Sequence, residues 1–339
     1  MPRGKKKAGK KRPDPNAGGG GDAIAGQHET PATTTEKDYI GTSTRGGKDP
    51  LRTMIAAVEN DHPERLEQLV RKHSGKKKKR SGKKGKGKKG GGAQINYNAR
   101  VVELGGGEKV PLLGDAAYLG HLGVLERLLR IKGINVNQGD EPDGCTPLFC
   151  AAQNDHVHCV ERLLAEDGIK VNQGNKTEGN TPLTIACEED HVRSVKALLA
   201  ADGIDVNVAD KQGCTPLFCA CQEGCIRSVR LLLAKEGIRV NQATHADATG
   251  LKGFPFQRIT PLRIAAQDGR LDVVRVLVEQ DGIDLDKPGN TCIEVGFQSP
   301  LQVARMLGFD AVVAVLLAAS AKDDDDTGGG GAVASAEEK

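Results

Sequence analysis

The chain has 339 residues, of which 37% are hydrophobic and 3% aromatic, and its formal net charge at pH 7 is +3. It lacks the run of about 18 apolar residues that a transmembrane helix needs, and its basic N-terminus, with no apolar segment behind it, is not expected to be a secretory signal. Its nine cysteines are therefore expected to be reduced thiols.

The small net charge hides a strong separation of charge along the chain. Residues 3–12 contain seven Lys and Arg, and residues 76–89 contain ten without any acidic residue. Without these 17 residues, 31 of the 48 basic residues remain against 45 acidic residues, a balance of about −14. The sequence thus predicts an acidic body with two basic tracts.

Two short phrases recur along the chain in step with each other. Cys145–Ala151 (CTPLFCA) returns as Cys214–Ala220, with the variant Asn180–Ala186 (NTPLTIA) between them. A second phrase, Gly-Ile-x-Val-Asn or a close variant, begins at Gly133, Gly168, Gly203, Gly237 and Gly282. A spacing of mostly 34 to 35 residues predicts stacked helical hairpins, which present extended binding surfaces rather than one deep reactive pocket.

Each repeat has the signals of two short helices. Thr146 or Thr181 is expected to cap the first helix through its side-chain oxygen, and the Pro that follows suits the first helical turn. Small residues come next and let two helices approach closely. The second helix has apolar residues at helical spacing, and a glycine such as Gly168 is expected to stop it.

This period and the Thr-Pro-Leu signature resemble those of ankyrin repeats. The resemblance implies an all-α repeat fold, an ankyrin solenoid of stacked helix-turn-helix units with β-hairpin fingers. Imperfect end repeats are expected because they cap the stack. The first small residue marks about seven repeats, five of them clear, at Ala57, Ala116, Ala151, Ala186, Ala220, Ala265 and Ala304.

The expected organisation is a repeat domain at 50–321 between a basic N-terminal tail at 1–49 and an acidic, Gly-rich C-terminal tail at 322–339. Both tails and a Lys/Gly-rich insert at 74–94 are expected to be disordered, because Gly and like-charged Lys cannot bury apolar surface. Two longer repeat spacings place insertions in the fingers at 243–259 and 287–298.

Three interpretations of the basic tracts stay open. They resemble nuclear-import signals, they can bind nucleic-acid phosphates without sequence preference, or the insert is a solvated linker. No aromatic residues interleave the lysines, so base stacking is not supported. The basic residues that carry these interpretations in the insert include Lys76, Lys77, Lys78, Lys79, Arg80, Lys83 and Lys84.

The resemblance also implies where partners bind, because partners of ankyrin repeats usually contact the finger tips and the exposed end of the first helix. The helix-end positions are Gln153, Asn154, Glu188, Glu189, Gln222, Glu223, Gln267 and Asp268, with Glu59 and Asn60 in the first copy. The finger-tip positions include Asp143, Lys176, Glu178, Lys211 and Gln212.

Acidic residues recur at the helix-end positions, and Asp61, Asp155 and Asp190 follow them. The concave face is therefore expected to be negative and to prefer a basic or amide-rich peptide, for which the chain's own Lys tract can compete. The alternative is that these acids only keep the surface soluble.

The long finger contains Phe254 and Phe256 on either side of a proline. These side chains either fold back on the neighbouring repeat or form an exposed apolar anchor for a partner.

No catalytic, cofactor or metal residue is assigned. Cys219, Cys221 and Cys225 invite a zinc interpretation, but each matches a repeat position and no spacing completes a four-ligand set. Residues 41–48 resemble a phosphate loop only loosely, since the spacing is one residue too long and Asp49 replaces the metal-binding hydroxyl.

The sequence predicts a non-enzymatic, monomeric scaffold or adaptor without a cofactor or membrane span, which binds other proteins in the cytoplasm or nucleus. The alternative is a nucleic-acid-associated adaptor, in which the Lys-rich insert binds the phosphate backbone and the repeats recruit a protein.

Overall fold

The structure is a computed structural model that describes residues 50–73, 97–98, 101–104, 108–245, 258–289 and 298–327. The N-terminal tail, residues 74–94, Phe254, Phe256 and most of the C-terminal tail lie outside these residues. No helix in the described part of the chain is both long and apolar enough to cross a membrane.

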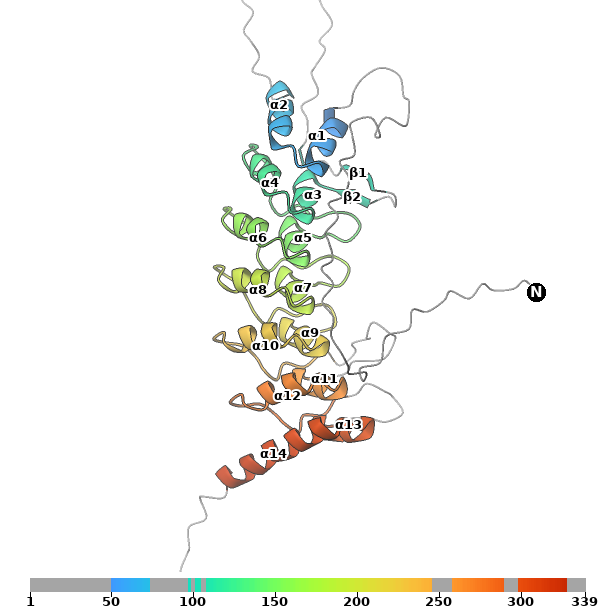
Figure 1. Ribbon diagram of the computed structural model, residues 1–339, viewed down its shortest axis with the longest axis vertical. Helices are drawn as coiled ribbons and strands as arrows, with labels where there is room; N and C mark the ends of the chain where they lie inside the picture. Colours follow the sequence, from blue (N-terminus) through green and yellow to red (C-terminus); the bar gives the residue numbers. More distant parts are fainter. Residues whose placement is uncertain are drawn as a thin grey trace, which may run out of the picture. The chain divides into compact units, whose positions relative to one another are not determined.

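Among the described residues of the unit 48–339, seven helix pairs follow one another along the chain (Figure 1). Each first helix packs on the first helix of the next pair, and each second helix on the next second helix. The pairs are α1 (Pro50–Glu59) and α2 (Pro63–His73), α3 (Leu112–Tyr118) and α4 (Leu122–Leu129), α5 (Pro147–Gln153) and α6 (Val157–Leu164), α7 (Pro182–Glu188) and α8 (Val192–Leu199), α9 (Pro216–Glu223) and α10 (Ile226–Leu233), α11 (Pro261–Gln267) and α12 (Leu271–Leu277), and α13 (Pro300–Leu307) and α14 (Asp310–Thr327).

The start of each first helix follows its sequence signal. The Oγ1 atoms of Thr146 and Thr181 accept the backbone N–H groups of Phe149 and Thr184, each at 3.2 Å, which confirms the predicted caps. Thr215 and Thr260 repeat this arrangement before α9 and α11. A Pro follows each of these caps, at a helical position that needs no N–H group.

The second helices end before the glycines at which the sequence predicted their ends. Helices α6, α8 and α10 end at Leu164, Leu199 and Leu233, and the next residue in each case is an alanine with right-handed backbone angles. Gly168, Gly203 and Gly237 lie beyond them in a turn, where their φ angles of 77°, 73° and 80° favour glycine. The glycines therefore shape the exit turn rather than stop the helix.

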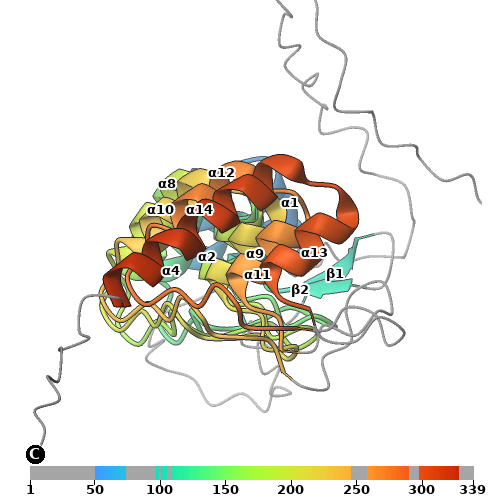
Figure 2. The ribbon, with the colours of Figure 1, turned by 90° about the horizontal axis from the view of Figure 1, so that it is seen from below.

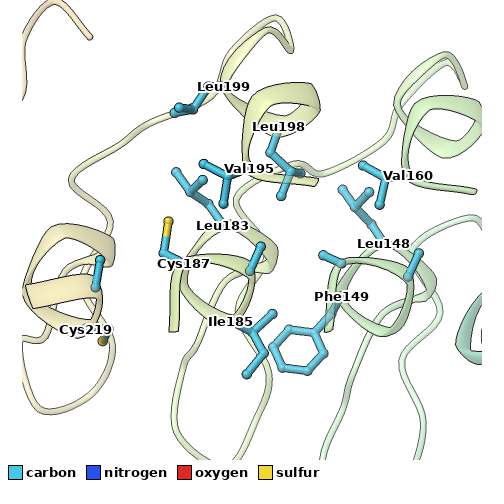
Figure 3. Close-up of a cluster of buried hydrophobic side chains, with 14 of the residues drawn as sticks. Leu148, Phe149, Val160, Leu183, Ile185, Cys187, Val195, Leu198, Leu199 and Cys219 are labelled. Carbon is cyan, nitrogen blue, oxygen red and sulfur yellow. The ribbon is translucent and has the colours of Figure 1, made fainter. Parts of the chain in front are cut away.

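The small residues of each repeat lie where the helices meet. Ala116, Ala151, Ala186, Ala220, Ala265 and Ala304 are all fully buried, as the predicted close approach requires. Around them, Leu148 and Leu183 of the first helices face Val160, Val195 and Leu198 of the second helices (Figure 3). A continuous apolar core therefore runs through the stack.

The fingers are narrow turns, and the one two-stranded sheet among the described residues lies before α3. It pairs β1 (Val101–Leu104) with β2 (Glu108–Val110) in antiparallel fashion, with Val101 opposite Val110. Elsewhere, backbone bonds such as Asn175 N–H to Asn180 O, at 3.0 Å, close the finger. The connections gather along one side of the helices (Figure 2).

The two predicted insertions leave the bases of their fingers intact. Thr244 N–H donates to Ile259 O at 3.0 Å, so the long finger at 243–259 closes like the shorter ones. Gly289 and Gln298 exchange two backbone hydrogen bonds of 3.0 and 3.1 Å and close the second. The helix pairs beside both fingers pack on their neighbours as the other pairs do.

Helix α14 continues to Thr327, six residues beyond the predicted end of the repeat domain at 321. Alanines at 318, 319 and 321 favour the helix up to that point, because alanine has the highest intrinsic helix propensity, whereas the four aspartates that follow do not explain the continuation.

A ladder of asparagine side chains ties each finger to the next repeat. Asn137 Nδ2 donates to Gly168 O at 2.9 Å while its Oδ1 accepts the N–H of Lys170 at 2.9 Å. Asn98, Asn172, Asn207 and Asn241 make the equivalent pairs of bonds. Asn98 therefore takes the same finger position in the first repeat as the later asparagines take in theirs.

Asn172→Ala is expected to lower the free energy of unfolding by about 1–2 kcal/mol, because two hydrogen bonds between repeats are lost. Urea denaturation followed by circular dichroism measures the change. Lys170→Ala, at an exposed position in the same segment, is the control and should change stability by less than about 0.5 kcal/mol. Equal stability of the two variants would contradict a role for the ladder.

Candidate functional site

The predicted helix-end residues occupy the same end of successive first helices. Helices α5, α7, α9 and α11 end at Gln153, Glu188, Glu223 and Gln267. Glu189, Glu223 and Asp268 are exposed, whereas Gln153, Asn154, Glu188, Gln222 and Gln267 are half-buried. We call this row of helix ends, together with the finger tips beside it, the inner face.

Backbone hydrogen bonds join the finger tips from one repeat to the next. Lys176 N–H donates to Asp143 O at 2.6 Å, and Lys211 N–H to Glu178 O at 2.8 Å. His245 N–H extends the series with a 3.0 Å bond to Gln212 O. The predicted finger-tip residues therefore belong to one connected strip rather than to independent loops.

Four of the predicted contact residues meet in a surface hollow between the third and fourth repeats. Its volume is about 360 Å³, and Asp143, Gln153, Glu178 and Glu188 line it. The other residues of the lining are Cys145, Phe149, Asn175, Thr177, Asn180 and Ile185. Figure 3 shows the Phe149 ring beside Ile185, on neighbouring first helices. We refer to this feature as the α5–α7 hollow.

Negative charge collects around Glu188 in this hollow. Burial raises the pKa of the Glu188 carboxyl above its usual value, and the nearby carboxylates of Glu223, Glu189, Glu178 and Asp210 raise it further. A cation placed here would relieve this repulsion. The site is thus electrostatically suited to a positively charged group.

Asp155 and Asp190 have a structural role that the sequence did not reveal. Asp190 Oδ1 accepts the hydroxyl of the fully buried Ser228 at 2.8 Å, and Asp155 Oδ1 accepts that of Ser194 at 2.7 Å. Each bond links a repeat to the second helix of the next. These carboxylates are therefore engaged within the stack, and the expected negative inner face depends on the other acids.

The histidines at the start of the second helices also link repeats. Nε2–H of His156 donates to Tyr118 O, and that of His191 to Gln153 O, each at 2.9 Å. Arg270 Nε makes the equivalent bond to Gln222 O at 2.9 Å. These histidines therefore have a structural role in the stack.

Tyr118 and Leu119 are inner-face residues that the sequence predictions omitted. They occupy the helix-end positions of the second repeat, two and three residues after Ala116, and Tyr118 is 51% exposed. The spacing that selected Gln153 and Asn154 also selects this pair. An exposed Tyr at such a position suits a partner contact, because tyrosines often dominate binding energy.

Asp115 stands at a position that other repeats fill with apolar side chains. Its equivalents are Cys150, Ile185, Cys219 and Ile264, all buried. Burial raises the pKa of Asp115 to about 6, and the nearby Glu59 carboxylate contributes in the same direction while His121 opposes it. This carboxyl is not part of the predicted contact surface.

Six of the eight described cysteines are buried, Cys145 and Cys225 are partly buried, and Cys292 lies outside the described residues. Burial raises the pKa of Cys145 to about 12 and those of Cys159 and Cys225 to about 11. Cys219 and Cys221, considered above for zinc, are buried and their pKa values are also raised, mainly by burial. Within the described residues, no three His, Cys, Asp or Glu side chains gather as a metal site.

Comparisons with known proteins agree with this architecture. The family "Ankyrin repeats (3 copies)" matches residues 113–210 and 171–244, and "Ankyrin repeat" matches 257–290. A search of the curated proteins finds no match. Among solved structures, the crystal structure of EF0377, an ankyrin repeat protein, matches with a TM-score of 0.51 and 20% identity over 60% of this chain and 96% of its own.

The family matches span the central helix pairs, and the pairs α1/α2 and α13/α14 lie outside them. Those end pairs nevertheless pack on their neighbours as the others do. The all-α repeat solenoid expected from the sequence is confirmed, and such repeats are generally protein–protein interaction modules. The chain is an ankyrin-repeat protein.

Proposed function

We propose that this protein is a non-enzymatic scaffold or adaptor that binds other proteins through its inner face. The α5–α7 hollow carries this proposal, because it brings residues of two helices and two fingers together at one accessible place. Carboxylates on its rim favour a basic or amide-rich partner. A monomer offers this surface without needing a second copy of the chain.

The described cysteines are poorly suited to act as nucleophiles. A thiolate is the nucleophilic form of cysteine, so thiols whose pKa values are raised to about 11 or 12 are poor nucleophiles at neutral pH. Burial in the core explains their presence in the repeats without a chemical role.

A charge-reversal experiment tests the proposed surface. Partners captured from native cell extract by the full-length chain are expected to be lost when Glu189→Lys and Glu223→Lys are combined, because both exposed carboxylates lie on the inner face. Asp202→Lys with Glu236→Lys is the matched control, since it makes the same charge change at exposed positions beyond the second helices. Equal capture by both double variants would overturn the proposal.

The Lys tract favours a second function, binding to nucleic acid, because residues 76–89 hold ten basic residues and no acid. In that case retention on duplex DNA should weaken steeply with salt and disappear when residues 74–92 are deleted. Capture that survives nuclease treatment and this deletion would support the protein-binding scaffold instead. Because the basic clusters resemble nuclear-import signals, we also propose that the protein resides in the cytoplasm or the nucleus.

A further inference from the structure

Asn180, in the α5–α7 hollow, departs from the repeat pattern. The same finger position holds Cys145, Cys214 or Ile259 in other repeats, whereas Asn180 places an amide there with only 9% of its surface exposed. Its Nδ2 donates to Glu178 Oε2 at 3.0 Å, which fixes the amide orientation. Its buried Oδ1 has no hydrogen-bond partner. An unpaired buried acceptor disfavours folding, so the fold alone does not explain this residue.

The lining of the hollow consists of acceptors above an apolar floor. Asp143, Glu178 and Glu188 supply carboxylates, and no Lys or Arg belongs to the lining. Asn180 belongs to the same lining, with its amide oxygen buried behind the surface. Lys176 belongs to the finger tip, where its side chain extends toward Gly144.

The floor of the hollow contains Phe149, Ile185 and Cys145. Phe149 and Ile185 are almost fully buried, so only the edges of their side chains face the hollow. The stem of a long cationic side chain packs well on such a surface while its charged head reaches the acceptors at the rim.

We propose that the α5–α7 hollow binds an arginine side chain of a basic partner peptide. This inference rests on the proposed function and specifies its partner. A guanidinium has five N–H donors and no acceptor, which matches a lining that supplies three carboxylates. Its planar fork of donors can also bond carboxylates in pairs, which the compact ammonium of lysine cannot do. The raised pKa of Glu188 fits its acidic surroundings, where no basic group among the described residues lowers it.

An NMR titration tests this assignment on the full-length chain. Acetyl-arginine-amide is expected to shift the side-chain amide signals of Asn180 and Gln153 and the methyl signals of Ile185 in a saturable way. Acetyl-citrulline-amide, which has a similar shape but no charge, should bind at least about tenfold more weakly. Acetyl-lysine-amide should also bind more weakly than arginine.

Two variants distinguish binding in the hollow from a general attraction to the acidic surface. Glu188→Gln keeps the size of the side chain and should weaken arginine binding by roughly tenfold. Glu236→Gln removes an exposed charge beyond the second helix α10, away from the lining, and should leave binding nearly unchanged. Unchanged binding in Glu188→Gln, or equal binding of citrulline, would overturn the proposal.

The outcome also distinguishes this inference from the proposed function. If arginine does not bind the hollow while partner capture still depends on Glu189 and Glu223, the inner face remains the binding surface and only the arginine assignment fails. If capture is insensitive to those two residues, the proposed function itself fails.

Discussion

Asp115→Asn is expected to raise the free energy of unfolding at neutral pH by about 2 kcal/mol, because the substitution removes a charge from an apolar position. The pKa of Asp115 is raised from an ordinary 3.8 to about 6, so ionising it in the folded protein is unfavourable. Asp115→Ile should stabilise at least as much, since Ile185 and Ile264 occupy the equivalent position in other repeats. Chemical denaturation at pH 7 measures both variants.

The same carboxyl predicts how this stability difference depends on pH. Between 3.8 and about 6 the folded state binds the proton more tightly than the unfolded state, so the contribution of Asp115 to stability improves as pH falls through this window. The advantage of Asp115→Asn should therefore be greatest above pH 6 and shrink toward pH 4. Asp272→Asn, with a side chain 78% exposed, is the control and should show no such trend. A pH-independent advantage would contradict the raised pKa as its cause.

Asp190→Ala is expected to lower the free energy of unfolding by about 2–4 kcal/mol. Two effects combine: the buried Ser228 hydroxyl loses its acceptor, and Ala must adopt the left-handed φ of 53° found at this position. The contact of Asp190 with Arg227 adds little, because the Arg227 side chain is 69% exposed. Urea denaturation of the variant gives the total.

Companion variants separate the two effects. Asp190→Gly removes the backbone strain, since Gly224 and Gly269 adopt φ angles of 80° and 65° at the equivalent positions, and should lose less stability than Asp190→Ala. A double-mutant cycle with Ser228→Ala isolates the hydrogen bond, and a coupling energy near zero would show that the contact contributes nothing.

The sequence predicted the architecture because each repeat carries its own local signals. Thr146 and the Pro after it set the start of a helix, and Ala151 sets the distance between helices, so the same reasoning holds repeat after repeat. The predicted helix ends at Gly168, Gly203 and Gly237 were wrong. A glycine with a left-handed backbone conformation suits both a helix end and the turn that follows it. The fold of an individual repeat could thus be predicted more reliably than its exact limits.

Contacts between repeats were harder to predict. The role of Asp190 depends on Ser228, which lies 38 residues away and becomes its neighbour only once two repeats are stacked. The α5–α7 hollow is likewise assembled from four segments, so individual contact residues could be named but their meeting place could not. The positions of Tyr118 and Asp115 could have been predicted from the sequence. Aligning the second repeat on Ala116 places Tyr118 at a helix-end contact position and Asp115 at a position that is apolar in other repeats.

Hydrogen–deuterium exchange of the full-length chain, with and without a captured protein partner, tests the central claim most directly. Partner binding at the inner face predicts slower exchange in the finger segments 141–145 and 175–180 and at the ends of α5, α7 and α9, with little change in α6, α8 and α10. Protection confined to the second helices, or to residues 74–96, would place the partner elsewhere and contradict the claim.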